Sequence, residues 1–202
     1  MMNNTDILEP NHFYHCYYRA NGKQDLFIER RNYLFFLRKF DKYVSPIAEI
    51  YCYCLMPNHY HFLIKIRGIN ILKKYFVGKV PPEYDGWPKI LSRQFSNFGN
   101  SYAKAFNKAT KRNGSLFSRP FKRKRILNID HLRKIVHYIH HNPVKAGLSS
   151  QPEDYPHSSY HEICENKSQI VQIEKVIDLF GDFENFKHVH HVPPEITGYK
   201  KQ

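Results

Sequence analysis

Hydrophobic and polar residues repeat with two different periods along this chain, and the periods divide it into strands and helices. Short stretches dense in aromatic and aliphatic residues predict strands at 13–19, 47–56 and 59–66, the last two joined as a hairpin by the turn Pro57–Asn58. Longer stretches with apolar residues at helical spacing predict helices at 31–44, 89–111 and 130–141. A short helix near 71–76 and a basic extended segment at 116–127 complete the pattern.

Proline and capping residues set the expected ends of these elements. Pro46 follows the first helix, and Pro143 is expected to end the last one, because proline lacks the N–H that a helix needs. Asn128 or Asp130 is expected to cap the start of that helix. Residues 67–88 hold several glycines and prolines, which predicts a loop around the short helix.

The order strand, helix, strand, strand, helix, strand, helix predicts an α+β fold. We expect a ferredoxin-like split βαβ antiparallel sheet with helices on one face. The pattern weakens after about Leu148, so we predict a folded domain at 1–148 and a C-terminal extension and tail at 149–202. Within the extension, residues 169–180 are expected to form a helix and residues 188–202 a solvated tail.

Composition excludes several classes of protein. The 202 residues contain no apolar run long enough to cross a bilayer, and the first residues lack the basic and apolar regions of a secretory signal. The 4 cysteines are too few and too scattered for a disulfide scaffold. We therefore expect a reduced, cytoplasmic protein without a membrane partner.

The positive charge is concentrated in one segment. The formal net charge is +13, and residues 86–129 carry eleven Lys and Arg side chains and no acidic one. Aromatic residues interleave with these cations, an arrangement typical of a groove for single-stranded nucleic acid, where cations follow phosphates and rings stack on bases. The alternative is a solvated helix face whose aromatic residues belong to the core.

His59 and His61 are the first candidate for chemistry. Side chains alternate along a strand, so these two imidazoles point the same way and can ligate one metal ion, while Tyr60 points to the other face. The alternative is a pair of surface histidines, since the chain holds 13 of them. A second such pair, His188 and His190, falls in the expected tail and is interpreted as solvated.

Tyr138 and Asn142 are the second candidate. They lie four residues apart and share one helix face, away from the apolar positions Ile135 and Ile139. A tyrosine that the core does not need can act as a nucleophile. The alternative is an amphipathic packing tyrosine followed by an ordinary Asn-Pro helix end.

Four motifs together resemble a known family. The segment MPNHYH at 56–61 resembles the histidine-hydrophobic-histidine motif of HUH endonucleases, with the aromatic Tyr60 where the family usually has an aliphatic residue. The segment YIHHNPVKAG at 138–147 resembles the tyrosine helix of single-tyrosine insertion-sequence transposases, especially the REP-associated branch. GSLFSRPF at 114–121 and DYPHSSY at 154–160 are similar to the same branch, so that the resemblance covers about residues 13–160.

The resemblance implies a mechanism. It makes residues 1–148 a catalytic domain, His59, His61 and Asn142 the ligands of a Mg²⁺ or Mn²⁺ ion, and Tyr138 the nucleophile. It implies that Tyr138 attacks single-stranded DNA, at hairpin-forming element ends, and forms a 5′-phosphotyrosine intermediate in DNA transposition. The choice of Mg²⁺ or Mn²⁺ comes from the resemblance, because imidazole ligands alone favour zinc, copper or nickel.

Other residues complete the hypothesis. His15 is expected to line the sheet or the core, and His141 is an alternative third ligand in place of Asn142. A homodimer is a possible assembly. The alternative function is a non-catalytic or domesticated single-stranded nucleic-acid-binding module. The predicted DNA-binding side chains are Arg112, Arg119, Lys122, Arg123, Lys124, Arg125 and Lys145.

Overall fold

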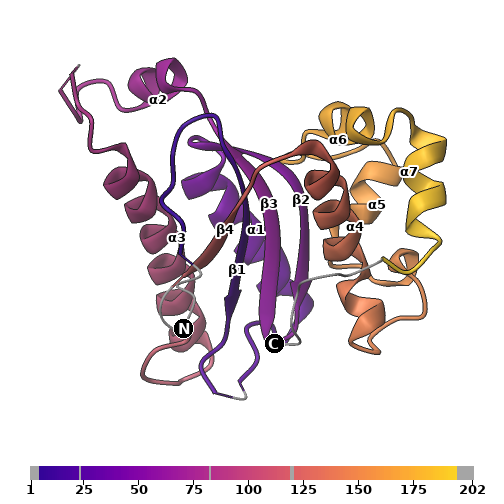
Figure 1. Ribbon diagram of the computed structural model, residues 1–202. Helices are drawn as coiled ribbons and strands as arrows, with labels where there is room; N and C mark the ends of the chain where they lie inside the picture. Colours follow the sequence, from indigo (N-terminus) through magenta and orange to yellow (C-terminus); the bar gives the residue numbers. More distant parts are fainter. Residues whose placement is uncertain (1–4, 23, 82, 119–120, 195–202) are drawn as a thin grey trace.

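A single antiparallel sheet organises the computed structural model, which describes residues 5–22, 24–81, 83–118 and 121–194. Its strands lie in the order β2-β3-β1-β4 (Figure 1). This is the ferredoxin-like order, and the predicted α+β fold is confirmed. The strands are β1 (Phe13–Arg19), β2 (Ala48–Met56), β3 (His59–Ile66) and β4 (Lys122–Ile126).

One face of the sheet carries α1 (Arg30–Val44) and α3 (Trp87–Ala109), which pack against each other. Aromatic rings fill the space between these helices and β3. The ring centroids of Phe40 and Phe62 lie 3.8 Å apart, and those of Phe36 and Phe98 lie 4.9 Å apart. Burial of such rings contributes a large share of the apolar area that folding removes from water. The short helix α2 (Ile69–Tyr75) lies in the loop where a short helix was predicted.

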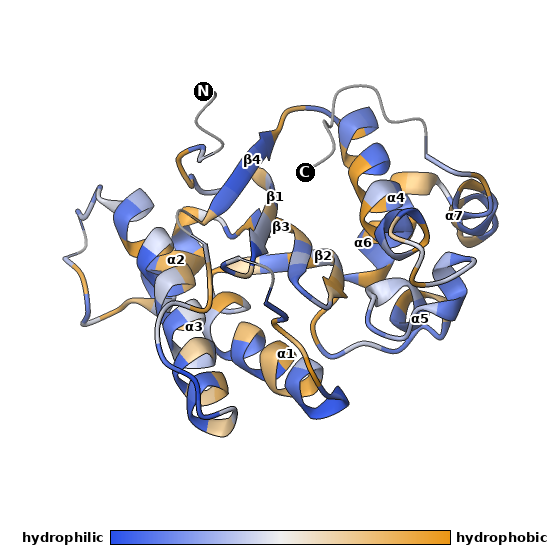
Figure 2. Cartoon of the chain, turned by 90° about the horizontal axis from the view of Figure 1, so that it is seen from below, coloured by the Kyte–Doolittle hydropathy of each residue, from blue (hydrophilic) through white to orange (hydrophobic). Residues whose placement is uncertain are grey.

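The opposite face carries α4 (Ile129–Lys145), which lies over β2 and β3 (Figures 1 and 2). The expectation of helices on one face therefore holds for α1 and α3 but is wrong for α4. The physical reason is that β2 and β3 are apolar on both faces, so the sheet needs a cover on each side. Asn128 caps α4, because its side chain accepts a 2.8 Å hydrogen bond from the His131 backbone N–H.

The prediction that Pro143 ends this helix is wrong. Pro143 is buried inside α4, and the helix continues to Lys145. Hydrogen bonds from Ala146 N to Asn142 O (3.0 Å) and from Leu148 N to Pro143 O (2.9 Å) close the last turn. Gly147, at φ +70°, then ends the helix in the left-handed conformation that glycine adopts most readily. Asn142 therefore stays helical, one turn after Tyr138.

The C-terminal extension packs on the outer side of α4. It contains the 3₁₀ turn Pro152–Asp154, α5 (Ser159–Cys164), α6 (Ile173–Phe180) and α7 (Phe183–His190). The helix predicted at 169–180 corresponds to α6. The solvated tail predicted from His188 is wrong at its start, because α7 continues to His190, which is fully buried. Among the described residues, no helix is both long and apolar enough to cross a bilayer.

A series of hydrogen bonds joins the extension to α4 and the sheet. His190 donates from Nδ1 to Phe186 O (2.7 Å) and accepts at Nε2 from His140 Nδ1 (2.9 Å). His140 Nε2 then accepts from Ser159 Oγ at 2.9 Å, and that oxygen accepts from the Tyr53 backbone N–H at 2.8 Å. Both imidazoles are neutral in this arrangement, because a proton on His190 Nε2 would face the His140 N–H.

These buried imidazoles predict that acid destabilises the fold. Burial lowers the pKa of His190 to about 3 and that of His137 to about 4. Below pH 6.5, the ordinary pKa of histidine, the unfolded chain binds more protons than the folded chain. The contribution of these histidines to the free energy of unfolding is therefore complete above about pH 6.5 and is lost as the pH falls. Each such histidine contributes a slope of about 1.4 kcal/mol per pH unit between its unfolded and folded pKa.

Urea unfolding at pH 7.5, 6.5, 5.5 and 4.5 tests this expectation. The free energy of unfolding should decline steadily below pH 6.5, and the decline should be shallower in His190→Gln, which removes one titrating group. A constant free energy over this range would show that burial of these imidazoles does not govern the acid response.

Candidate active site

The strand β3 presents His59 and His61 to a cavity of about 320 Å³ between the sheet and α4. Tyr17 pairs with His61 and Arg19 pairs with His59 across the β1–β3 ladder, so all four side chains share this face of the sheet. Their neighbours Tyr60 and Phe62 point to the other face, into the aromatic core. The prediction that the two histidines share one strand face is confirmed.

Each histidine is neutral at neutral pH. Burial, followed by the charge of Arg19, lowers the pKa of His59 to about 4. Burial, followed by the neighbouring His15 and His59, lowers the pKa of His61 well below its ordinary value. A neutral imidazole keeps one nitrogen lone pair free of a proton, which is the form that binds metal ions.

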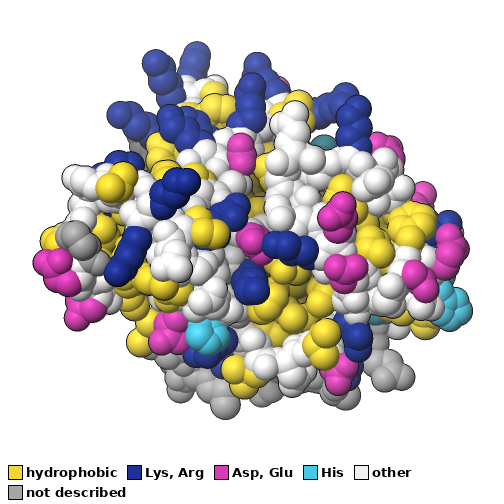
Figure 3. Space-filling model, turned by 90° about the horizontal axis from the view of Figure 1, so that it is seen from above, with side chains coloured by type: hydrophobic (Ala, Val, Ile, Leu, Met, Phe, Trp, Pro, Cys, Tyr) yellow, Lys and Arg dark blue, Asp and Glu magenta, His cyan; other side chains and the backbone are white. Residues whose placement is uncertain are grey.

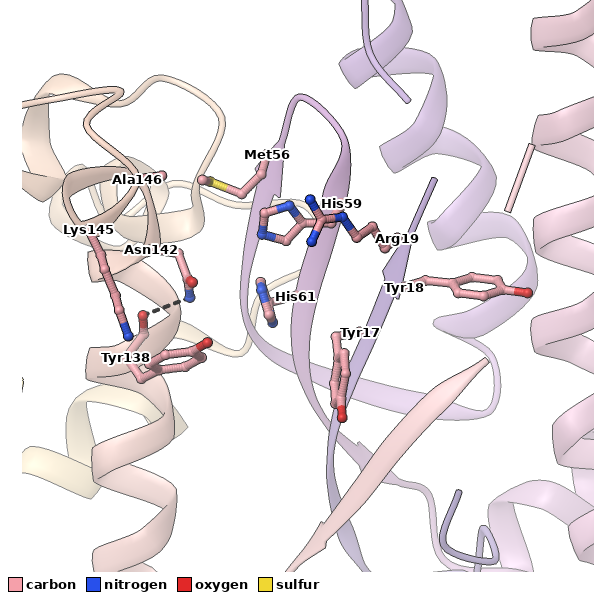
Figure 4. Close-up of a pocket in the computed structure, with 10 residues that line it drawn as sticks. All are labelled: Tyr17, Tyr18, Arg19, Met56, His59, His61, Tyr138, Asn142, Lys145 and Ala146. Carbon is pink, nitrogen blue, oxygen red and sulfur yellow. Dashed lines mark hydrogen bonds between the residues drawn. The ribbon is translucent and has the colours of Figure 1, made fainter. Parts of the chain in front are cut away.

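Tyr138 faces the two histidines from α4 across the cavity (Figure 4). The centroids of the Tyr138 and His61 rings lie 5.7 Å apart, nearly perpendicular to one another. Burial raises the pKa of the Tyr138 phenol, and a hydrogen bond with the Asn142 side chain acts in the opposite direction. The phenol is therefore half-buried beside a group that favours its ionised form.

Asn142 also lines the cavity, one helical turn after Tyr138. Its amide nitrogen donates a 2.9 Å hydrogen bond to the Tyr138 backbone carbonyl, which leaves the amide oxygen as a possible ligand. The alternative ligand His141 does not reach the cavity. It points to α7, where its Nε2 donates to His190 O at 2.8 Å.

The donor set fits a divalent ion in kind. Two neutral imidazoles and one amide oxygen reach the cavity, and the described residues contain no group of three His, Cys, Asp or Glu side chains placed to hold a metal ion. The protein therefore offers three neutral donors, so water or a bound anion must complete the coordination of any ion held here.

Alternation along β4 divides the predicted basic segment between two faces. Lys122 and Lys124 pair with Tyr17 and His15 and lie on the face of the cavity. Lys122 Nζ lies 5.8 Å from the centre of the Tyr17 ring, and Lys124 Nζ forms a partly exposed 3.7 Å pair with Asp6. Figure 2 shows β4 as a hydrophilic strand at the edge of the sheet.

Arg123 and Arg125 take the opposite face, where intramolecular partners hold them. Arg123 Nε donates to Asp6 O at 2.5 Å, and its NH2 group contacts Ser92 of α3 at 3.4 Å. Arg125 forms a 2.7 Å salt bridge with Glu9. These arginines stabilise the N-terminal segment and α3 rather than extend the cavity.

The remaining predicted DNA-binding residues have different surroundings. Arg112 donates a 2.7 Å hydrogen bond to Asn107 Oδ1 and another hydrogen bond to Gln24 Oε1. It therefore ties the end of α3 to the segment after β1. Lys145 is exposed at the cavity, with its Nζ 5.8 Å from the centre of the Tyr138 ring. Arg119 lies outside the described residues. In the view of Figure 3, Lys and Arg side chains gather along the upper edge of the molecule.

Two participants were not foreseen from the sequence. Arg19 lines the cavity, and His15, expected in a passive role, contacts His61 directly. Period-two alternation along 13–19 places His15, Tyr17 and Arg19 on one face. Only the pairing of β1 with β3 shows that this is the histidine face.

Comparisons with known proteins support the family resemblance. No family model matches the chain. A Haemophilus influenzae protein named as a putative REP-associated tyrosine transposase is 27% identical over an alignment of 121 residues, which covers 56% of this chain and 59% of that protein. The chain therefore matches little more than half the length of this curated relative.

A solved structure of a REP-associated tyrosine transposase, bound to a REP hairpin, has the same fold. The two chains align with a TM-score of 0.57 and 20% sequence identity, over 84% of this chain and 90% of the other. The similarity to REP-associated tyrosine transposases that the motifs indicated is thus confirmed in sequence and in fold.

The contact between Asn142 and the phenol generates a prediction about ionisation. Replacement of Asn142 by Ala removes the group that lowers the pKa of Tyr138, so this pKa should rise further. NMR titration of ¹³Cζ-labelled tyrosine, with Tyr138→Phe to identify the signal, measures the change. Asn100→Ala, on the exposed side of α3, is the matched control. An unaltered Tyr138 titration in Asn142→Ala would disprove the interaction.

Proposed function

We propose that this chain is a transposase-type enzyme that cuts and rejoins single-stranded DNA. The observation that carries the proposal is the placement of Tyr138 on α4 opposite His59 and His61 of β3, within one cavity. A nucleic-acid-binding module needs neither a cavity tyrosine nor two neutral imidazoles facing it. Similarity to REP-associated tyrosine transposases supports the same function.

The reaction is an exchange of phosphodiester bonds. The Tyr138 phenol oxygen attacks a phosphorus of the DNA backbone, a bond forms between them, and the bond from phosphorus to the 3′ oxygen breaks. The phenol loses one proton and the leaving 3′ oxygen gains one, so that a 5′-phosphotyrosine link and a free 3′-hydroxyl result. The bond energy is kept in the covalent link, and attack by a 3′-hydroxyl on this link reverses the step.

The cavity residues prepare this attack. Asn142 favours the ionised phenol, and Lys145 and Arg19 bring positive charge to a backbone phosphate. We propose that His59, His61 and the Asn142 amide oxygen hold Mg²⁺ or Mn²⁺. When bound, the ion supplies Lewis-acid polarisation of the phosphate and neutralises developing charge.

The proposed substrate is single-stranded DNA with a hairpin, as in the REP-hairpin complex of the structural neighbour. Lys122 and Lys124 lie beside the cavity on β4 and can follow the phosphates of the strand that enters it. We assign the chemistry to residues 1–148. The competing function, a binding module without cleavage, predicts salt-sensitive binding and no covalent product.

Incubation with a labelled single-stranded DNA hairpin and Mn²⁺ or Mg²⁺ tests the enzyme. We expect a protein–DNA adduct that survives denaturation, because the phosphotyrosine link is covalent. The adduct should disappear in Tyr138→Phe, which lacks the nucleophile, and in His59→Ala. Denaturing gel electrophoresis measures its yield.

The matched control is Tyr17→Phe, since the Tyr17 side chain lies on the histidine face and lines the same cavity. An adduct of equal yield in Tyr138→Phe would exclude Tyr138 as the nucleophile. Tight, salt-sensitive binding without any adduct in the native chain would favour the binding module.

The division of β4 between two faces predicts which cations bind DNA. Lys122→Ala with Lys124→Ala should weaken binding and reduce the slope of log K against log salt by about 1.4, the value for two phosphate contacts of a single strand. Lys104→Ala with Lys108→Ala removes the same charge from the exposed side of α3 and should change the slope less. Fluorescence anisotropy at several salt concentrations measures both. Equal slopes in the two double variants would show that Lys122 and Lys124 of β4 do not contact the DNA phosphates.

A further inference from the structure

Both cavity histidines are held by a hydrogen bond at the same ring nitrogen. His59 Nδ1 lies 2.6 Å from Asn58 Oδ1, and His61 Nδ1 lies 2.9 Å from His15 Nε2. Neither Asn58 nor His15 lines the cavity. In each histidine, Nδ1 therefore takes part in a hydrogen bond with a neighbouring side chain, and Nε2 is not used in these contacts.

The partner of His59 decides which nitrogen carries the proton. A carbonyl oxygen such as Asn58 Oδ1 only accepts hydrogen bonds, so His59 Nδ1 is the donor. A neutral imidazole has one N–H group, and the lone pair of His59 is therefore on Nε2. Asn58 thus prepares His59 to act as a ligand through Nε2.

The partner of His61 leaves two possibilities, because either imidazole can donate. If His15 Nε2 donated, His61 would carry its own proton on Nε2 and would have no lone pair for a ligand. If His61 Nδ1 donates, His15 Nε2 accepts, and the His61 lone pair lies on Nε2. Two histidines that bind one ion through the same nitrogen require the second arrangement.

We propose that Asn58 and His15 are positioning residues that fix the tautomers of His59 and His61, so that both present Nε2 to a divalent ion. The proposal rests on the proposed function, because it takes a metal ion as the ligand of the two histidines. It gives His15 a defined role in the site, where the sequence indicated a passive one.

The geometry of the sheet makes His15 rigid enough for this role. It is 1% exposed, and its ring lies almost parallel to that of His61 with centroids 5.1 Å apart. The two residues belong to the adjacent strands β1 and β3, whose backbone ladder holds them in register. The Tyr138 ring packs edge-on against both, at 5.9 Å from His15 and 5.7 Å from His61. A hydrogen bond from a ligating imidazole to a neighbouring side chain orients the imidazole and raises its basicity.

The tautomers can be read directly in the protein without metal or DNA. Long-range ¹H–¹⁵N NMR of ¹⁵N-histidine-labelled chain distinguishes a protonated Nδ1 from a protonated Nε2. We expect His59, His61 and His15 all to carry their proton on Nδ1. A proton on Nε2 of His61 in the native chain would overturn the proposal, and this result does not depend on the adduct assay.

Variants then test what the contacts do for metal binding. Titration with Mn²⁺ alone, followed by electron paramagnetic resonance, should show an affinity 10–100-fold lower in His15→Phe and in Asn58→Ala. His15→Gln places an amide oxygen near the position of Nε2, and Asn58→Asp keeps an acceptor. Both should recover most of the affinity, which a merely structural role would not produce.

The exposed His188 of α7 supplies the control, since His188→Ala removes an imidazole far from these contacts along the chain. It should leave the Mn²⁺ affinity unchanged. If His15→Phe does not fold, the tautomers of the native chain and the Mn²⁺ affinities of Asn58→Ala and Asn58→Asp still test the proposal. Unchanged Mn²⁺ affinity in Asn58→Ala and in a folded His15→Phe would refute the positioning role.

Discussion

The antiparallel pairing of β1 with β3 in the centre of the sheet is the contact on which the site depends. These strands are far apart in sequence, and their register sets Tyr17 opposite His61 and Arg19 opposite His59. A shift of one residue would turn β3 over, sending its histidines into the aromatic core and Tyr60 and Phe62 into the cavity. The stacked rings of Phe40 and Phe62 oppose that shift. The chemistry of one face is thus held in place by the packing of the other.

A second contact brings Tyr138, the proposed nucleophile, to the histidines. Ile135 and Ile139 are buried where α4 lies over β2, and this apolar docking turns Tyr138 and Asn142 toward the cavity. On the far side of α4, hydrogen bonds between the neutral side chains of His190, His140 and Ser159 tie the same helix to the extension and to β2. Helix α4 therefore has partners on two sides, which limits the positions that Tyr138 can take. This arrangement suits the proposed reaction, because a misplacement of the nucleophile by about 1 Å can cost about 100-fold in rate.

The sequence predicted the local features well and the long-range ones incompletely. Strand and helix positions, the shared face of His59 and His61, and the shared face of Tyr138 and Asn142 follow from periods of two and 3.6 residues. The side of the sheet that α4 covers does not follow, because it depends on which strands are apolar on both faces. The roles of His15, His140 and His190 also required the structure, since each is defined by a partner more than 40 residues away or on another helix. The prediction that Pro143 ends α4 was wrong because it considered only the local cost of proline in a helix. In the structure, burial of Pro143 and the hydrogen bonds that close the last turn offset this cost.

The distribution of charge connects the fold to the proposed reaction. The eleven cations of the acid-free segment do not form one surface, because alternation along β4 turns Arg123 and Arg125 toward intramolecular partners and leaves Lys122 and Lys124 on the cavity face. The described residues that line the cavity include Arg19 and Lys145 and no acidic side chain. An anionic phosphate therefore meets no like charge there, whereas a divalent cation meets only neutral donors. In the proposed reaction the cation lacks an opposite charge from the protein, and the phosphate supplies it. We therefore expect the cavity to bind the ion more tightly when a phosphate is bound than when it is absent.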